Sequence, residues 1–204
     1  MADKSLKRIA ITTEEITVYE PERIVAVLES GWNMVHLRHP GASLREMRSL
    51  IETIPQKLHR RLRIHGHFEL TNEFNLGGLH LNRRCPSLPA NYRGPFSCSC
   101  HSIEEAKRAA KCDYVTLSPI FDSVSKQGYR AAFSEKDLAE IDKTIGSGVI
   151  TEVIALGGIT PERLREVKRL GFNGFATLGS LMGADSHEAF RAKLNEFNNE
   201  YNLL

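Results

Sequence analysis

Short apolar segments rich in β-branched residues alternate with stretches of helical periodicity along the whole chain. Eight segments have the length and composition of buried strands: Arg8–Thr13, Met34–Arg38, Leu62–His65, Gly78–Leu81, Phe96–Cys100, Tyr114–Leu117, Glu152–Leu156 and Gly174–Leu178. A period near 3.6 predicts helices at Glu22–Ser30, Ser43–His59, Phe68–Phe74, Ile103–Lys111, Ser134–Ile145, Pro161–Leu170 and Ser186–Glu200. Only the link after the fourth strand is poor in helical signals.

The repeat of a strand followed by a helix predicts the fold. Eight such units are expected for a (β/α)8 TIM barrel of the α/β class, although the chain is short for that fold. A doubly wound open sheet is the alternative, but it normally has fewer strands, and no Gly-x-Gly-x-x-Gly follows the first strand. No proline- or serine-rich linker divides the chain, so residues 1–204 are expected to form one barrel domain.

Composition excludes several classes of protein. The 204 residues are 41% hydrophobic and 25% charged, with a net charge of +2, which is typical of a globular domain and not of a disordered or fibrous chain. Basic residues form no long cluster, so nucleic acid is not an expected partner. No apolar run reaches the roughly 18 residues of a membrane span, and the first residues lack a signal-peptide pattern. A cytoplasmic protein with no membrane partner is expected.

The four cysteines, Cys85, Cys98, Cys100 and Cys112, are expected to remain thiols in a reducing compartment. The run from Cys98 to His101 could suggest a metal site, but no second cysteine pair with zinc-site spacing exists. No metal site is therefore predicted. Cys98 and Cys100 are expected to share one face of a strand as small buried residues.

Polar residues follow several predicted strands, where a barrel has its active site. Six of the eight histidines lie there: His36, His39, His65, His67, His80 and His101. A lone histidine is commonly structural, and we interpret His39, His59, His67 and His187 in that way. His101 is the candidate for chemistry, because imidazole titrates near neutral pH and Ser99 and His101 share one strand face, opposite Cys98 and Cys100. The alternative is that His101 only caps the helix at Ile103–Lys111.

Glycines after the last two strands predict a phosphate site. Gly157-Gly158 follows the seventh strand and Leu178-Gly179 the eighth, where barrels often bind phosphate through backbone N–H groups. The alternative is that these glycines only permit tight turns. The loop 121–128, which contains Ser123, Ser125 and Lys126, adds hydroxyl donors and a cation suited to phosphate or diphosphate.

Taken together, these motifs resemble the thiamine phosphate synthase and thiazole tautomerase superfamily. The resemblance spans nearly the whole chain and rests on Gly78-Leu79-His80-Leu81, Ser99-Cys100-His101-Ser102, Asp113-Tyr114-Val115, Pro119-Ile120-Phe121, Ser125-Lys126 and Ala155-Leu156-Gly157-Gly158-Ile159. It implies a (β/α)8 barrel that acts on thiazole phosphate in thiamine biosynthesis. The run Gly157–Lys168 looks especially like the tautomerase branch. The resemblance also implies a homodimer.

The synthase of this superfamily joins hydroxymethylpyrimidine diphosphate to thiazole phosphate and needs Mg²⁺. Its metal-binding carboxylates follow the third and fourth strands, where this chain has His65-Gly66 and Asn82-Arg83-Arg84-Cys85 instead. Arg38, Lys126 and Ser99 still match positions that bind the diphosphate. The resemblance therefore favours the tautomerase over the synthase, which stays an alternative and alone would require Mg²⁺.

The tautomerase aromatises a carboxylated thiazole phosphate by proton transfer, without a metal or other cofactor. The resemblance assigns acid–base catalysis to His101. It implies that Gly158, Gly179, Leu178, Ser123 and Ser125 bind the phosphate. We expect Arg38 or Lys126 to neutralise the substrate carboxylate, and His36 and His65 to shape the pocket. A non-catalytic protein that binds thiazole phosphate or thiamine phosphate is a third interpretation.

Overall fold

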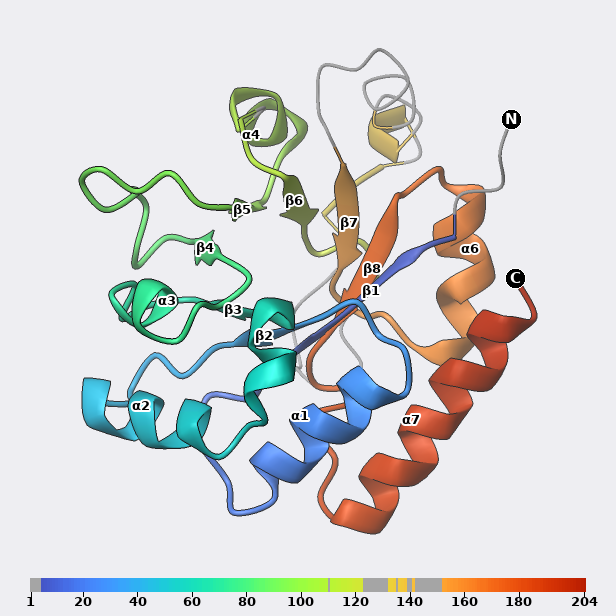
Figure 1. Cartoon of the computed structure of the whole chain (residues 1–204). Helices are drawn as coiled ribbons and strands as arrows, with labels where there is room; N and C mark the ends of the chain where they lie inside the picture. The colour runs from blue at the N-terminus through green and yellow to red at the C-terminus, as the bar shows by residue number, and fades with distance from the viewer. Residues whose placement is uncertain (1–4, 110, 123–131, 135, 139–140, 142–151) are drawn as a thin grey trace.

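The computed structural model describes residues 5–109, 111–122, 132–134, 136–138, 141 and 152–204. Eight parallel strands form a closed barrel in chain order, and β1 pairs with β8 (Figure 1). The strands are β1 (Lys7–Ile11), β2 (Met34–Leu37), β3 (Leu62–Ile64), β4 (Leu79–Leu81), β5 (Phe96–Cys100), β6 (Tyr114–Leu117), β7 (Val153–Leu156) and β8 (Gly174–Thr177). The closed ring of eight parallel strands confirms the predicted TIM barrel.

Helices follow the strands and surround the barrel (Figure 1). They are α1 (Glu20–Glu29), α2 (Leu44–Glu52), α3 (Leu70–Glu73), α4 (Ile103–Arg108), α6 (Leu164–Arg169) and α7 (His187–Asn202), with 3-10 helices η1 (Gln56–Arg61) and η2 (Pro161–Arg163). The link between β4 and β5 contains no helix over residues 82–95, as predicted. Most of the predicted helix Ser134–Ile145 lies outside the described residues. Within the part of the chain that is described, no helix has the length and apolarity needed to cross a bilayer.

One predicted helix is divided in two. The expected helix Ser43–His59 ends at Glu52, and η1 begins at Gln56. Pro55 lies between them, and proline both lacks an amide donor and clashes with a helical backbone before it. The expected capping box is confirmed: the Glu46 amide donates to the Ser43 hydroxyl, and the Glu46 carboxylate accepts from the Ser43 amide.

Two hydrophobic clusters stabilise the barrel. The larger cluster fills the space between the strands and the helices, where Trp32, Phe175 and Phe197 are fully buried. The smaller one lies inside the barrel and includes Ile9, Ile11, Tyr114, Ile154 and Ala176, which come from β1, β6, β7 and β8. Strands β2 to β5 instead contribute buried polar residues, namely His36, Arg63, His80 and Ser97. The barrel interior is therefore apolar on one side and polar on the other.

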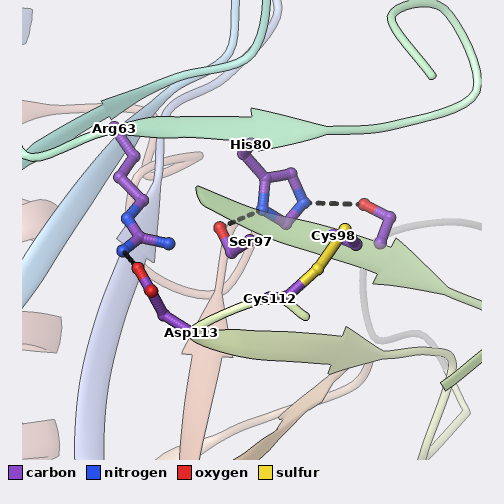
Figure 2. The surroundings of a disulfide bond; sticks show 7 residues. Arg63, His80, Ser97, Cys98, Cys112 and Asp113 are labelled. Atoms are coloured by element: carbon purple, nitrogen blue, oxygen red, sulfur yellow. Dashed lines mark hydrogen bonds and ion pairs between the residues drawn. A yellow bond between two sulfur atoms is a disulfide. The ribbon is translucent and has the colours of Figure 1, made fainter. Parts of the chain in front are cut away.

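The expectation that all four cysteines remain thiols is wrong for two of them. Cys98 in β5 and Cys112 just before β6 form a disulfide (Figure 2). The two positions are distant in sequence, but β5 and β6 pair in parallel with Ser97 opposite Tyr114, which brings Cys112 beside β5. Cys85 and Cys100 are free. Cys98 and Cys100 both contact the outer hydrophobic cluster, so they share one strand face as predicted.

Candidate active site

The loop after β7 requires glycine at its centre. Gly157 and Gly158 have positive φ angles of 94° and 64°, a region that side chains with a Cβ atom rarely adopt. A Cβ atom at Gly158 would lie 2.3 Å from the Asp122 carbonyl oxygen and 2.8 Å from Arg163 Nη1. The Arg163 guanidinium donates a 2.7 Å hydrogen bond to the Gly158 carbonyl oxygen and so holds this loop in place. The tight turn and the close approach both exclude larger residues.

The loop after β8 is tied to the loop after β7. The Ser180 hydroxyl donates to the Ile159 carbonyl oxygen at 2.6 Å, and the Met182 amide donates to the Leu178 carbonyl oxygen at 2.8 Å. The amides of Gly158 and Gly179 donate to no other residue in the described part of the chain. Because β7 and β8 pair directly, these two donors belong to adjacent loops at one end of the barrel. Unpartnered backbone N–H groups of this kind suit an anion such as phosphate.

His101 follows β5 at the same end of the barrel and is exposed. Its Nδ1 lies 3.1 Å from the Ser118 carbonyl oxygen, and its backbone N–H donates to the Glu105 carboxylate at 2.7 Å. A carbonyl oxygen can only accept, so Nδ1 carries a hydrogen, and in the neutral form of the ring Nε2 has the lone pair. Ser102, not His101, caps α4 by accepting from the Glu105 amide. The alternative role of His101 as a helix cap therefore belongs to its neighbour.

The remaining predicted site residues are placed as follows. Arg38 follows β2 and Glu14 follows β1. The Arg38 guanidinium donates to the Glu14 carboxylate at 3.0 and 3.1 Å. The Ser99 hydroxyl contacts His80 Nε2 at 2.8 Å. Ser123, Ser125 and Lys126 lie outside the described residues. Arg38 and Ser99, the two anion-binding candidates among the described residues, thus lie at the carboxyl ends of strands, and each already has a partner within the protein.

The structure brings three histidines together inside the polar side of the barrel. His36 Nδ1 lies 2.9 Å from His65 Nε2, and the rings of His65 and His80 are stacked with centroids 4.3 Å apart. His36 Nε2 contacts the Tyr114 hydroxyl at 2.5 Å. His80 contacts the Ser97 hydroxyl through Nδ1 at 2.7 Å, as Figure 2 shows. The cluster extends from the centre of the barrel toward its open end.

Sequence reasoning treated His36 and His65 as pocket-shaping residues and did not single out His80. A usable signal was present, since His36 lies between Val35 and Leu37, and His80 lies between Leu79 and Leu81. Alternation places such histidines on the strand face opposite the outer core, and therefore inside a closed barrel. Because β2, β3 and β4 are neighbours in the barrel, the histidines in β2 and β4 and the histidine directly after β3 lie close together.

The three imidazoles are neutral at physiological pH. Burial lowers the pKa of His36 and His65 well below the ordinary histidine value, and the other histidines lower it further. Burial, followed by the charge of Arg63, lowers the pKa of His80 to about 3. Arg63 is itself buried and ion-paired with Asp113, as Figure 2 shows. Each neutral imidazole of this cluster therefore has one nitrogen with a lone pair and one N–H donor.

Acidification is expected to destabilise the protein through this cluster. The folded pKa of His80 lies below its unfolded value near 6.5, so the unfolded state binds protons first as pH falls, and stability is lost between about pH 6.5 and 3. His80 alone should cost about 2 kcal/mol between pH 7.5 and pH 5. Urea unfolding at both pH values, with a chelator present, measures the loss. The variant His80→Gln should show a smaller pH dependence, and equal slopes in both proteins would contradict the prediction.

The four histidines interpreted as structural all have partners away from this cluster. His39 Nε2 lies 2.7 Å from the buried Glu20 carboxylate. His59 contacts the carbonyl oxygens of Ile54 and Phe74, His67 contacts that of Ala42, and His187 lies 3.2 Å from the Glu22 carboxylate. These contacts connect helices and loops of the outer layer to one another.

Comparison with known proteins relates this chain to one family. Residues 9–181 match the family described as thiamine monophosphate synthase. A thiamine-phosphate synthase of Syntrophomonas wolfei is 28% identical over 185 residues, which cover 86% of this chain and 87% of the relative. A putative thiamine-phosphate synthase 2 of Aquifex aeolicus is 29% identical over 170 residues, 79% of this chain and 89% of the relative.

A solved structure agrees with these relatives. The thiamine phosphate pyrophosphorylase of Bacteroides thetaiotaomicron is 37% identical, with a TM-score of 0.84 over 97% of this chain and 98% of that one. None of the three relatives carries the name of a tautomerase, so the preference for that branch in the sequence analysis receives no support from them. On the family match and the shared barrel, the chain belongs to the thiamine monophosphate synthase family.

Proposed function

We propose that the protein is a transferase of the thiamine phosphate synthase type, which joins hydroxymethylpyrimidine diphosphate to thiazole phosphate. The observation that carries the proposal is the pair of linked loops after β7 and β8. The amides of Gly158 and Gly179, which have no partner among the described residues, suit the phosphate of the thiazole. The names of two relatives that match over most of their length, thiamine-phosphate synthase and thiamine phosphate pyrophosphorylase, support the same type of enzyme.

In this reaction a carbon–nitrogen bond forms between the thiazole nitrogen and the pyrimidine methylene carbon, while the carbon–oxygen bond to diphosphate breaks. Diphosphate leaves with the electron pair and therefore needs nearby positive charge. Arg38 lies at the open end of the barrel, where its guanidinium forms an ion pair with the exposed carboxylate of Glu14. Exchange of Glu14 for diphosphate would place the guanidinium on the leaving group. The phosphate loops would hold the thiazole and orient its nitrogen.

Mg²⁺, which the resemblance implies for the synthase, does not fit the described residues at this end of β2 to β5. Mg²⁺ prefers carboxylate oxygens in an octahedral arrangement, whereas these strands present imidazoles and the amide of Asn82. The Asn82 carbonyl oxygen already accepts from the amides of Arg84 and Cys85. We therefore assign neutralisation of the diphosphate charge to side chains of the protein.

His101 favours tautomerisation as a second candidate function. Its Nε2 lone pair is exposed at the open end of the barrel, and its Nδ1–H is held by the Ser118 carbonyl oxygen. This arrangement suits a general base that removes a proton and returns it elsewhere on the thiazole. The reaction needs no metal, which agrees with the shortage of carboxylates in the described part of this site.

Paired assays of one protein sample separate the two functions. The first measures thiamine phosphate formed from hydroxymethylpyrimidine diphosphate and thiazole phosphate, with and without Mg²⁺. The second follows aromatisation of the carboxylated thiazole phosphate tautomer by ultraviolet absorbance. Thiamine phosphate formation above background is expected. If only aromatisation is accelerated, the transferase proposal is wrong and tautomerisation replaces it.

The variant His101→Asn is expected to distinguish the mechanisms. Asparagine can still donate to the Ser118 carbonyl oxygen, but it has no titratable nitrogen. Coupling should fall by less than about tenfold, whereas tautomerisation should fall by about 100-fold to 10,000-fold, the usual contribution of a general acid–base residue. A large loss of coupling with unchanged thiazole phosphate binding would place His101 in the transferase chemistry and contradict this division of roles.

A further inference from the structure

We propose that His36, His65 and His80 form a binding site for one divalent transition-metal ion, with zinc as the ion of choice. The three side chains come from three neighbouring strands or strand ends, β2, β3 and β4, and each offers one ligand nitrogen. These nitrogens all lie within 4.8 Å of one another. The proposal concerns metal binding alone and stands apart from the reaction proposed above.

The distances suit a single ion after a small adjustment. Zinc binds imidazole nitrogens at about 2.0–2.1 Å in a tetrahedral arrangement, so two such nitrogens lie about 3.4 Å apart. His36 Nδ1 and His65 Nε2 are already 2.9 Å apart, and the ring centroids of His36 and His80 are 4.9 Å apart. The ligand nitrogens lie within 4.8 Å of one another, so side-chain movement of about 1–1.5 Å brings the most distant pair to this separation.

Hydrogen bonds around the cluster orient the outer nitrogens. Tyr114 O–H can donate to Met34 Sδ at 3.5 Å, which leaves its oxygen to accept from His36 Nε2–H. His36 Nδ1 then presents its lone pair to the cluster. Ser97 can likewise accept from His80 Nδ1–H, and His80 Nε2 would exchange its 2.8 Å contact with the Ser99 hydroxyl for the ion. Metal-binding histidines commonly donate their second N–H to such a partner, which sets the tautomer and the ring orientation.

The chemistry of the donors selects the class of ion. Neutral imidazole suits zinc, copper, nickel and cobalt, whereas Mg²⁺ prefers oxygen ligands. Arg63 opposes a cation, because it is buried and its charge reaches His36 and His80. That charge is offset by the ion pair with Asp113, and the three ligands themselves are uncharged. Three protein ligands also leave a coordination position for water or substrate, and His65 is only half-buried toward the open end.

Metal titration of the full chain tests the proposal directly. Protein stripped with a chelator and then dialysed is titrated with Zn²⁺ by calorimetry and with Co²⁺ by visible absorption. We expect one ion per chain, the visible bands of four- or five-coordinate Co²⁺, and no thiolate-to-cobalt charge-transfer band. Mg²⁺ should not compete. Absence of Zn²⁺ binding, or displacement of Zn²⁺ by Mg²⁺, would overturn the proposal.

Variants test whether the histidines or the cysteines bind the ion. His65→Ala is expected to weaken Zn²⁺ binding at least 100-fold, whereas His67→Asn, on the same loop and with a positive φ that asparagine tolerates, should leave it unchanged. Tyr114→Phe should weaken binding by about 10-fold to 100-fold through loss of the partner of His36. If His65→Ala fails to fold, Tyr114→Phe and the Co²⁺ spectrum decide. Binding that survives His65→Ala, or a thiolate charge-transfer band, would assign the ion to cysteine and refute the site.

Discussion

Replacing Gly158 with alanine is expected to weaken thiazole phosphate binding at least tenfold and to lower the free energy of unfolding by about 1–3 kcal/mol. Two costs act together. The φ angle of 64° disfavours any residue with a Cβ atom, and that atom would lie 2.3 Å from the Asp122 carbonyl oxygen. A backbone atom cannot rotate away, so the loop after β7 must move. Its movement displaces the amide that we assign to the phosphate.

Calorimetric titration with thiazole phosphate and urea unfolding measure the two effects. Gly41→Ala is the matched control, because a Cβ atom there would meet nothing within 4 Å. It should bind as tightly as the unchanged protein and lose little stability. Binding by Gly158→Ala within twofold of the unchanged protein would show that the loop after β7 does not hold the phosphate, even if stability falls as expected.

Trp32→Ala is expected to lower the free energy of unfolding by about 3–5 kcal/mol, a large fraction of the 5–15 kcal/mol typical of a folded domain. The indole is fully buried and packs edge-on against Phe175 of β8 and Phe197 of α7, with centroids 5.5 and 5.7 Å away. Its Nε1–H donates to the Asn198 side chain at 2.9 Å. Removal leaves a cavity where the last helix meets the barrel and leaves this acceptor with one partner fewer.

Trp32→Phe is the control, since it keeps an aromatic ring at the contact and loses the hydrogen bond and part of the volume. Its expected loss is about half that of the alanine variant or less. Trp32 is the only tryptophan, so unfolding has to be followed by circular dichroism and not by tryptophan fluorescence. A loss below about 1 kcal/mol for Trp32→Ala would mean that the outer core closes around the missing ring.

Some features of the site were readable from the sequence because their causes are local. Gly157-Gly158 follows a predicted strand, and the turn there needs positive φ angles that glycine adopts without strain. The position of His101 at the carboxyl end of β5 was predicted from the sequence because the residue directly follows that strand. The sequence did not show whether His101 or Ser102 caps α4, because this depends on which side chain accepts a hydrogen bond from the Glu105 amide, and in the structure that side chain is Ser102.

Other features depend on contacts between distant segments. Cys98 and Cys112 meet only because β5 and β6 pair in one register, and nothing in their spacing predicts a disulfide. The division of the helix expected at Ser43–His59 was readable from Pro55 and was missed. The preference for the tautomerase branch rested on missing carboxylates, on His101 and on the run Gly157–Lys168, whereas the relatives are named as a synthase and a pyrophosphorylase.

The sequence by itself determined the barrel, because strand alternation and helical periodicity are properties of neighbouring residues. It also determined the glycine loops after the last two strands, for the same reason. Only the tertiary structure decided that His36 of β2, His80 of β4 and His65, which directly follows β3, form one cluster, with Tyr114 in contact with His36. The physical reason is closure of the barrel, which directs alternate side chains from every strand into one small interior and sets their distances through the register between strands.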